Sequence, residues 1–244
     1  MPAVFRITLN RPQKRNALDA ASIQWLRGQL SQASIDAEAR VILLRGEGTD
    51  FCSGADLSAI QKIRDSSILE NFDDAKELRD LFLQMRRHRL PIIAAVHGRA
   101  LAGGCGLATA CDLILASESA QFGYPEVRIG FVPAMVMAIL RRSVSEKVAF
   151  DLLTTGRPIG AREALDMGLI NAVYPETEFE AAVEKYAGEM AARPASAVQL
   201  TKELLYHMDA LPFESAIHAG AQVNAIARMS EECRQGIDRF LKKE

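Results

Sequence analysis

The sequence predicts an α/β protein with a helical C-terminal part. In the first half of the chain, apolar runs of strand length alternate with segments of helical periodicity, while nearly every segment beyond Pro133 has a helical period. The chain has 244 residues, 49% apolar and 25% charged, which is enough for one sizeable core. We therefore expect a core over residues 1–188 and a helical C-terminal region over residues 189–244.

The first three elements follow from periodicity and end signals. Residues 3–9, "AVFRITL", alternate in polarity and are rich in β-formers, so they predict a strand. Residues 19–36 have helical spacing, and either Asp19 or Ser22 can act as the N-cap. Residues 40–46, "RVILLRG", form an apolar run closed by glycine, which predicts a buried strand.

The middle of the chain continues the alternation. Residues 69–88 form a charged amphipathic pattern that ends before Pro91, and this predicts a helix. A buried strand over 92–96, a glycine turn, a short helix from about Gly104 and a strand over 112–117 follow. Beyond these, the predicted helices cover residues 145–156, 160–168, 179–193 and 196–209, with a helical tail to Glu244.

Composition excludes several classes of protein. A net charge of −2 gives no general attraction to nucleic acid or to an anionic membrane. The first thirty residues lack the layout of a signal peptide, and no apolar run approaches the roughly 20 residues that span a bilayer. The cysteines have no CxxC spacing, so we expect neither a metal site nor disulfides, and we predict a cytoplasmic protein. They are Cys52, Cys105, Cys111 and Cys233.

Two glycine-containing turns are the candidate functional segments. Residues 99–108, "RALAGGCGLA", place three glycines between a predicted strand and a predicted helix. Residues 51–57, "FCSGADL", have the same strand–turn–helix context. A helix N-terminus exposes unpaired N–H groups, and glycine lets a ligand oxygen approach them. The two turns together can form an oxyanion hole from main chain alone; each turn alone is equally explained by packing a helix on a strand.

Several motifs in order carry a family resemblance over nearly the whole chain. Together they resemble the crotonase family, the enoyl-CoA hydratase and isomerase superfamily. The resemblance implies a spiral of ββα units followed by helices used in trimer contacts, hence a homotrimer or a dimer of trimers. It also implies an acyl-CoA substrate and no separate cofactor. The motifs are "NRPQKRNAL" (10–18), "FCSGADL" (51–57), "AAVHGRALAGGCGLATACDLILAS" (94–117), "FGYPEVRIGFVP" (122–133) and "TGRPIGAREALDMGLINAV" (155–173).

The same resemblance implies roles for single residues. The thioester oxygen would lie between the backbone N–H groups of Ser53 and Gly103. Phe240 and Lys243 match a C-terminal F-x-x-K that reaches the CoA nucleotide of a neighbouring subunit, although a solvated terminal helix explains them equally well. Asp56 can instead cap a helix or hold its loop. The implied substrate-binding residues are Ser53, Gly54, Ala55, Asp56, Leu57, Gly103, Gly104, Phe240 and Lys243.

The proton-transfer group is where the sequence departs from the family. Hydratases of this family usually have two glutamates, one in G-G-G-C-E and one in F-G-x-P-E. Here the first position is Gly106, whereas the second is kept as Glu126. The family's P-G-x-G-G is replaced by "PAMVM" (133–137), which puts larger apolar groups beside the acyl chain. Glu126 is therefore the catalytic candidate; without the family it would be interpreted as a surface carboxylate.

A single carboxylate is compatible with more than one activity. We favour hydration of a 2-enoyl-CoA, in which Glu126 polarises a water and passes a proton to C2. Isomerisation needs one base that moves a proton between C2 and C4, so it stays as the alternative. A third interpretation is an acyl-CoA-binding homologue that lost catalysis with the glutamate at Gly106. Ser53 as a nucleophile is disfavoured, because "FCSGA" is not G-x-S-x-G and no His or Asp has an evident triad role.

Overall fold

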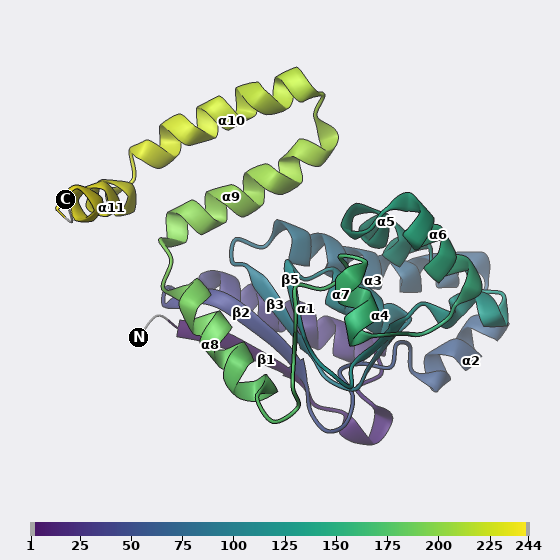
Figure 1. Cartoon of the computed structure of the whole chain (residues 1–244). Coiled ribbons are helices and arrows are strands. Elements are labelled where there is room, and N and C mark those ends of the chain that lie inside the picture. Colours follow the sequence, from purple (N-terminus) through teal and green to yellow (C-terminus); the bar gives the residue numbers. More distant parts are fainter. Residues whose placement is uncertain (1–2, 243–244) are drawn as a thin grey trace.

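The computed structural model describes residues 3–242 and is built around a parallel sheet (Figure 1). The five strands lie in the order β1-β2-β3-β5-β8, and every neighbouring pair is parallel. Parallel neighbours need crossover connections, which the intervening helices supply. The strands are β1 (Ala3–Leu9), β2 (Ala39–Gly46), β3 (Ile92–Val96), β5 (Leu113–Ser117) and β8 (Ala172–Tyr174).

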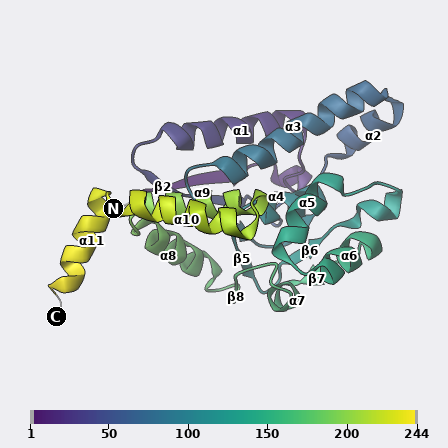
Figure 2. The same ribbon diagram turned by 90° about the horizontal axis from the view of Figure 1, so that it is seen from above.

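Helices cover both faces of this sheet. On one face lie α1 (Ala20–Ile35) and α3 (Ile68–Arg87), and on the other lies α8 (Phe179–Ala191) (Figure 2). Side chains of β2, β3 and β5 therefore point into two separate apolar clusters, one of which includes Phe179 and Val183 of α8. This two-sided burial explains why the central strands are continuous apolar runs rather than alternating ones.

The helix ends agree with the capping signals in the sequence. Asp19 is the N-cap of α1, and its side chain accepts from the Ser22 N–H; the predicted alternative, Ser22, lies inside the helix. Ser67 and Glu70 form a reciprocal capping box that begins α3 one residue earlier than predicted. Helix α2 (Leu57–Asp65) lies between α1 and α3 in the sequence. It begins after Asp56, as its position behind the turn at residues 51–57 predicts.

A second, three-stranded sheet was not predicted. It contains β4 (Arg99–Leu101), β6 (Gln121–Gly123) and β7 (Ile159–Gly160), with β6 in the centre. These strands have two or three residues each, which is too short to show a period of two. Its edge strand β4 leads directly into α4 (Gly103–Thr109), so the small sheet positions the second glycine turn.

The segment beyond Pro133, predicted to be almost wholly helical, also contains two short strands that were not predicted. It contains β7 and also β8, which adds to the edge of the main sheet beside β5. All three residues of β8 are only half-buried, so no apolar run marks it. The other elements that precede α8 are the 3-10 turns η1 (Pro12–Lys14) and η2 (Pro125–Ile129), and the helices α5 (Ala134–Ser143), α6 (Glu146–Thr155) and α7 (Ala161–Asp166).

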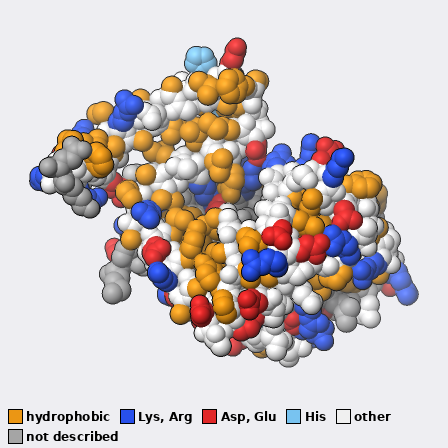
Figure 3. Space-filling view, viewed as in Figure 1, with side chains coloured by type: hydrophobic (Ala, Val, Ile, Leu, Met, Phe, Trp, Pro, Cys, Tyr) orange, Lys and Arg blue, Asp and Glu red, His pale blue; other side chains and the backbone are white. Residues whose placement is uncertain are grey.

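The C-terminal helices project from the core (Figure 1). They are α9 (Ala195–His207), the 3-10 turn η3 (Met208–Ala210), α10 (Phe213–Arg228) and α11 (Glu231–Leu241). The buried Lys202 ammonium holds α9 to the core by donating to the Asp112 carboxylate (2.7 Å) and to the Leu90 carbonyl (2.9 Å). Hydrophobic side chains gather on α10 (Figure 3), where Phe213 is 79% exposed. The predicted division at residue 188 falls inside α8.

Candidate active site

Three of the sequence motifs lie side by side. The Leu18 N–H donates to the Gly54 carbonyl at 2.7 Å, and the Asp56 N–H donates back to the Leu18 carbonyl at 2.8 Å. On the other side, the Cys52 N–H donates to Arg99 and the Leu101 N–H to Cys52, both at 3.0 Å. The two glycine turns and the segment before α1 are thus joined by main-chain hydrogen bonds into one surface.

Two glycines make this close approach feasible. Gly54 has a φ of +97°, and a Cβ on it would lie 2.8 Å from the Leu101 carbonyl oxygen. A Cβ on Gly104 would lie 2.2 Å from the Cys52 carbonyl oxygen. Neither glycine is among the residues that line the cavity described below. Their observed contribution is to pack one turn on the other.

Gly103 is the first residue of α4, where an N–H has no partner within the helix. Within residues 3–242 its amide has no hydrogen-bond partner. No atom lies within 4 Å of where its Cβ would be, and the residue lines the cavity. The Gly103 amide is therefore a free donor at an open surface.

The Ser53 amide is different, because it is already used. It donates to the Arg15 carbonyl at 3.0 Å. Arg15 and Asn16 both have left-handed backbone, with φ of 51° and 53°. The buried Asn16 side chain holds this strained turn by donating to the carbonyls of Glu47 (2.9 Å) and Asp50 (2.8 Å). A ligand oxygen would have to share or replace the Arg15 carbonyl to use the Ser53 N–H.

A cavity of about 810 Å³ opens on these turns. Ser53, Ala55, Asp56 and Gly103 line it together with Glu126, so the structure brings half of the predicted site residues together. Ile60 and Ile63 of α2 are three residues apart and so lie on one face of the helix, which lines the cavity. Sequence analysis did not use this spacing. The apolar part of the lining is formed by Ile60, Ile63, Leu78, Leu101, Ile129, Phe131, Val132, Met135 and Val136.

Glu126, the predicted catalytic residue, lines this cavity. It lies in η2, directly after Pro125. Its Oε2 atom is buried and is the one such side-chain N or O atom within residues 3–242 that has no hydrogen-bond partner. Burial raises the pKa of the Glu126 carboxyl above its ordinary value. An unpaired carboxyl with a raised pKa is suited to exchanging protons near neutral pH.

The other acid in the lining has a structural task. Asp56 is buried and caps α2, with Oδ1 accepting from the Ser58 N–H at 3.1 Å and Oδ2 from the Arg11 guanidinium at 2.9 Å. The hydrogen bonds from Ser58 hold the pKa of the Asp56 carboxyl below its usual range. Because both oxygens are paired, Asp56 holds the loop and offers no free base.

Of the remaining predicted binding residues, Phe240 lies outside this cavity. Leu57 begins α2, and the described structure does not extend to its side chain. Phe240 lies on α11, is 69% exposed and contacts a separate groove beside α9, so it does not reach the cavity of its own chain. Lys243 lies outside the described residues. The role predicted for Phe240 and Lys243 toward a neighbouring subunit stays a prediction.

Three cations in the lining were missed by sequence analysis. Lys14, Arg15 and Arg128 are exposed side chains at the cavity. In the part of the chain that the structure describes, none of the three forms an ion pair. Lys14 and Arg15 lie inside the first motif, so their position there was the available signal. An anionic part of a ligand would meet these side chains where the cavity opens to solvent, which is called its mouth below.

The thiols beside this site stay protonated. Burial raises the pKa of the Cys52 thiol to about 12 and that of Cys105 to about 11, so both stay protonated near neutral pH. Over residues 3–242, no three His, Cys, Asp or Glu side chains are grouped so that they could hold a metal ion. In the same range, no helix combines the length and apolarity that crossing a bilayer requires.

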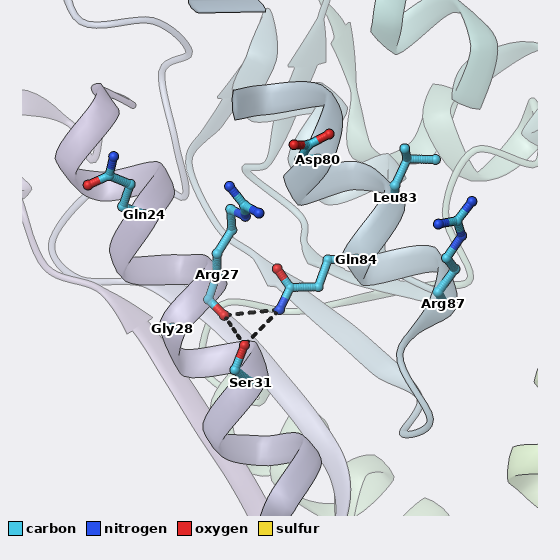
Figure 4. A pocket seen from close by; sticks show the side chains of 8 residues that line it. All are labelled: Gln24, Arg27, Gly28, Ser31, Asp80, Leu83, Gln84 and Arg87. Carbon is cyan, nitrogen blue, oxygen red and sulfur yellow. Dashed lines mark hydrogen bonds between the residues drawn. The ribbon is translucent and has the colours of Figure 1, made fainter. Parts of the chain in front are cut away.

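A second hollow of about 500 Å³ lies between α1 and α3 (Figure 4). Three of its residues are joined by hydrogen bonds: the Gln84 amide donates to the Arg27 carbonyl at 3.0 Å and to the Ser31 hydroxyl at 3.1 Å. Figure 4 shows these contacts between Gln84 of α3 and residues Arg27 and Ser31 of α1. The groove contains no buried unpaired acid, so the cavity at Glu126 is the candidate active site.

Comparisons with known proteins identify the family of the chain. The family model described as enoyl-CoA hydratase/isomerase matches residues 2–244. A Thermus thermophilus protein named "Putative enoyl-CoA hydratase" is 38% identical over 237 residues, covering 97% of this chain and 94% of the relative. The 2,3-dehydroadipyl-CoA hydratase of Escherichia coli is 32% identical over 242 residues, with 98% and 92% covered.

A solved structure extends the agreement to three dimensions. The enoyl-CoA hydratase of Mycobacterium smegmatis superposes with a TM-score of 0.94 at 31% identity, covering 99% of this chain and 93% of that one. Fold and sequence identity thus agree over nearly the whole length. The predicted crotonase fold and family are confirmed: the chain belongs to the enoyl-CoA hydratase/isomerase family.

Proposed function

We propose that the protein hydrates a 2-enoyl-CoA thioester, with Glu126 as the acid–base group. The observation that carries this proposal is the buried, unpaired Oε2 of Glu126 in the same cavity as the free Gly103 amide. One group is able to move a proton, and the other is able to stabilise an oxyanion. The names of two relatives, both called hydratases, support hydration as the type of reaction.

The mechanism follows from these two groups. The thioester oxygen accepts from the Gly103 N–H, and from the Ser53 N–H once the ligand oxygen replaces the Arg15 carbonyl. The Glu126 carboxylate removes a proton from a water molecule while the water oxygen forms a bond to C3. Electrons of the C2–C3 double bond move onto the thioester oxygen as an enolate, and Glu126 then returns the proton to C2. The N–H donors act where negative charge develops, which is where they lower the barrier most.

The exposed cations at the mouth support CoA as the carrier. CoA has phosphate groups, whereas the interior of the cavity is apolar. Lys14, Arg15 and Arg128 would meet the phosphates, and the walls formed by α2 and α5 would meet the acyl chain. No cofactor besides the CoA of the substrate enters the proposed reaction.

Isomerisation is the second candidate, and one observation favours it. Gly106 carries no carboxylate, and the space next to it is occupied by Val136 rather than by a polar group. A site with one base fits the transfer of a proton from C2 to C4 or the reverse. This reaction passes through a dienolate, whose oxyanion uses the same N–H donors, and it consumes no water.

The assembly and the compartment are further proposals. Exposed apolar side chains on the C-terminal helices, such as Phe213 and Ile226, support burial of these helices in a homotrimer or a dimer of trimers. We also retain the prediction of a cytoplasmic enzyme. Sedimentation of the purified protein tests the first proposal, and a monomer at micromolar concentration would contradict it.

Product analysis tests the proposed function. The protein is treated with chelator and incubated with trans-2-hexenoyl-CoA and with trans-3-hexenoyl-CoA. Formation of 3-hydroxyhexanoyl-CoA from the first thioester is the expected result, whereas conversion of the second into the first identifies the isomerase. If both thioesters bind in calorimetry and neither is converted, the protein is an acyl-CoA-binding homologue, and the absence of binding would overturn the whole proposal.

A further inference from the structure

The two departures from the family pattern, at Gly106 and in residues 133–137, meet in space. A Cβ placed on Gly106 would lie 2.2 Å from Cγ1 of Val136 and 3.2 Å from its Cβ. The Cζ atom of Phe82 would lie 3.3 Å away on another side. Gly106, Val136 and Phe82 are all buried. No side chain fits at residue 106 while Val136 keeps its position.

We propose that Val136 is the residue that determines reaction specificity at this site. It occupies the space through which a second carboxylate at residue 106 would reach the substrate, so the site works with Glu126 alone. Val136 itself lines the cavity and presents an apolar surface there. This role of Val136 rests on the proposed enoyl-CoA chemistry, and it concerns which of the two reactions, hydration or isomerisation, is faster.

The consequence concerns the water molecule. Addition to C3 needs a water that is oriented and deprotonated, whereas a shift of the double bond needs only a base beside C2 and C4. With Val136 in place, one wall near the reacting carbons has no hydrogen-bonding group for a water. Val136 therefore lowers the rate of hydration relative to that of isomerisation, since only hydration needs this water, while the oxyanions of both reactions use the same N–H donors.

The steric part of the proposal is tested by thermal unfolding. Gly106→Ala should lower Tm by on the order of 5 °C, because the added methyl overlaps Val136. Val136→Ala removes Cγ1, so the double variant Gly106→Ala/Val136→Ala should melt higher than the sum of the two single changes predicts. Gly188→Ala, at a helical glycine of α8 with no atom within 4 Å, is the matched control and should not lower Tm. A Gly106→Ala variant that melts like the wild type overturns the contact.

The chemical part is tested by the product ratio. Val136→Ala should raise hydration relative to isomerisation, and Gly106→Glu/Val136→Ala should raise it by about 10-fold or more, since acid–base groups typically contribute 100-fold or more. Gly106→Glu alone should lose stability without this gain. Val183→Ala, which removes the same atoms from α8 on the opposite face of the sheet, should leave the ratio unchanged.

The outcomes separate this proposal from the one on which it rests. If the wild type converts neither hexenoyl-CoA, the proposed function fails and the reaction role of Val136 fails with it, while the melting data still decide the contact. If the wild type is active and the ratio is the same in the wild type, Val136→Ala and the folded double variant Gly106→Glu/Val136→Ala, Val136 does not determine specificity.

Discussion

The residues that line the cavity are of two kinds. Two of them carry polar groups without partners within residues 3–242, namely the Gly103 N–H and the buried Oε2 atom of Glu126. Others, from α2 and α5, are apolar, such as Ile60, Ile63 and Val136. A buried polar atom without a partner, such as Oε2, costs stability, whereas buried apolar surface such as that of Val136 contributes to it. The comparison shows that the chain tolerates an unfavourable buried atom where chemistry is proposed and keeps Val136 in ordinary core packing.

The largest expected effect comes from removing the carboxyl group of Glu126. Glu126→Gln keeps the shape of the side chain and removes its exchangeable carboxyl proton. Turnover of the best enoyl-CoA should fall about 100- to 10,000-fold, the usual contribution of a general acid–base group. Steady-state rates measure the loss, and calorimetry with saturated hexanoyl-CoA should show nearly unchanged binding. Wild-type turnover in Glu126→Gln would assign the carboxyl a structural role.

A second change blocks the oxyanion site without touching the core. Since no protein atom lies within 4 Å of the Cβ position at Gly103, the side chain of Gly103→Val points into open space. We expect a Tm close to that of the wild type, together with a loss of turnover on the order of 100-fold, because loss of one oxyanion contact has this scale. Gly103→Ala, which adds one methyl, should have the smaller effect. Normal rates in folded Gly103→Val would place the oxyanion hole elsewhere.

A ligand pair probes the N–H donors directly. S-hexyl-CoA is a thioether that lacks the carbonyl oxygen of hexanoyl-CoA and keeps the chain and the nucleotide. It should bind roughly 2- to 10-fold more weakly, the value of a typical net hydrogen bond. Titration calorimetry compares the two ligands. Equal affinities would mean that the Gly103 amide does not bind the thioester.

The smallest expected effect is the pH dependence of stability. Burial raises the pKa of Glu126 in the folded state, so the folded protein holds this proton more tightly than the unfolded chain does. The stabilising contribution is complete at pH values below the ordinary glutamate pKa and is lost as the pH rises through the folded-state value. Glu126→Gln keeps a neutral group throughout, so it should melt higher than the wild type at about pH 8 and no higher at about pH 4. Scanning calorimetry at both values checks the sign.

Sequence analysis predicted the part of the structure that depends on local patterns. The central strands, α1, α3 and the helix after the glycine turn appear where apolar runs and caps indicated them, and Glu126 lies in the cavity with Gly103. Strands β4, β6 and β7 were missed because two or three residues show no period. The hydrogen bond from Ser53 to Arg15 and the contact of Gly106 with Val136 were missed for a different reason. Both join residues far apart in sequence, and the residue types involved do not indicate which residue lies opposite.

The main-chain bonds that join Leu18 to Gly54 and Cys52 to Arg99 have a consequence for folding. They connect segments separated by tens of residues, so the cavity has no local precursor in a partly folded chain. Long-range pairings of this kind form slowly, because loop closure precedes any gain from contacts. Individual helices are able to form before the pocket exists. During refolding, recovery of acyl-CoA affinity will therefore lag behind recovery of helical circular dichroism, and it will report the arrival of the complete native state.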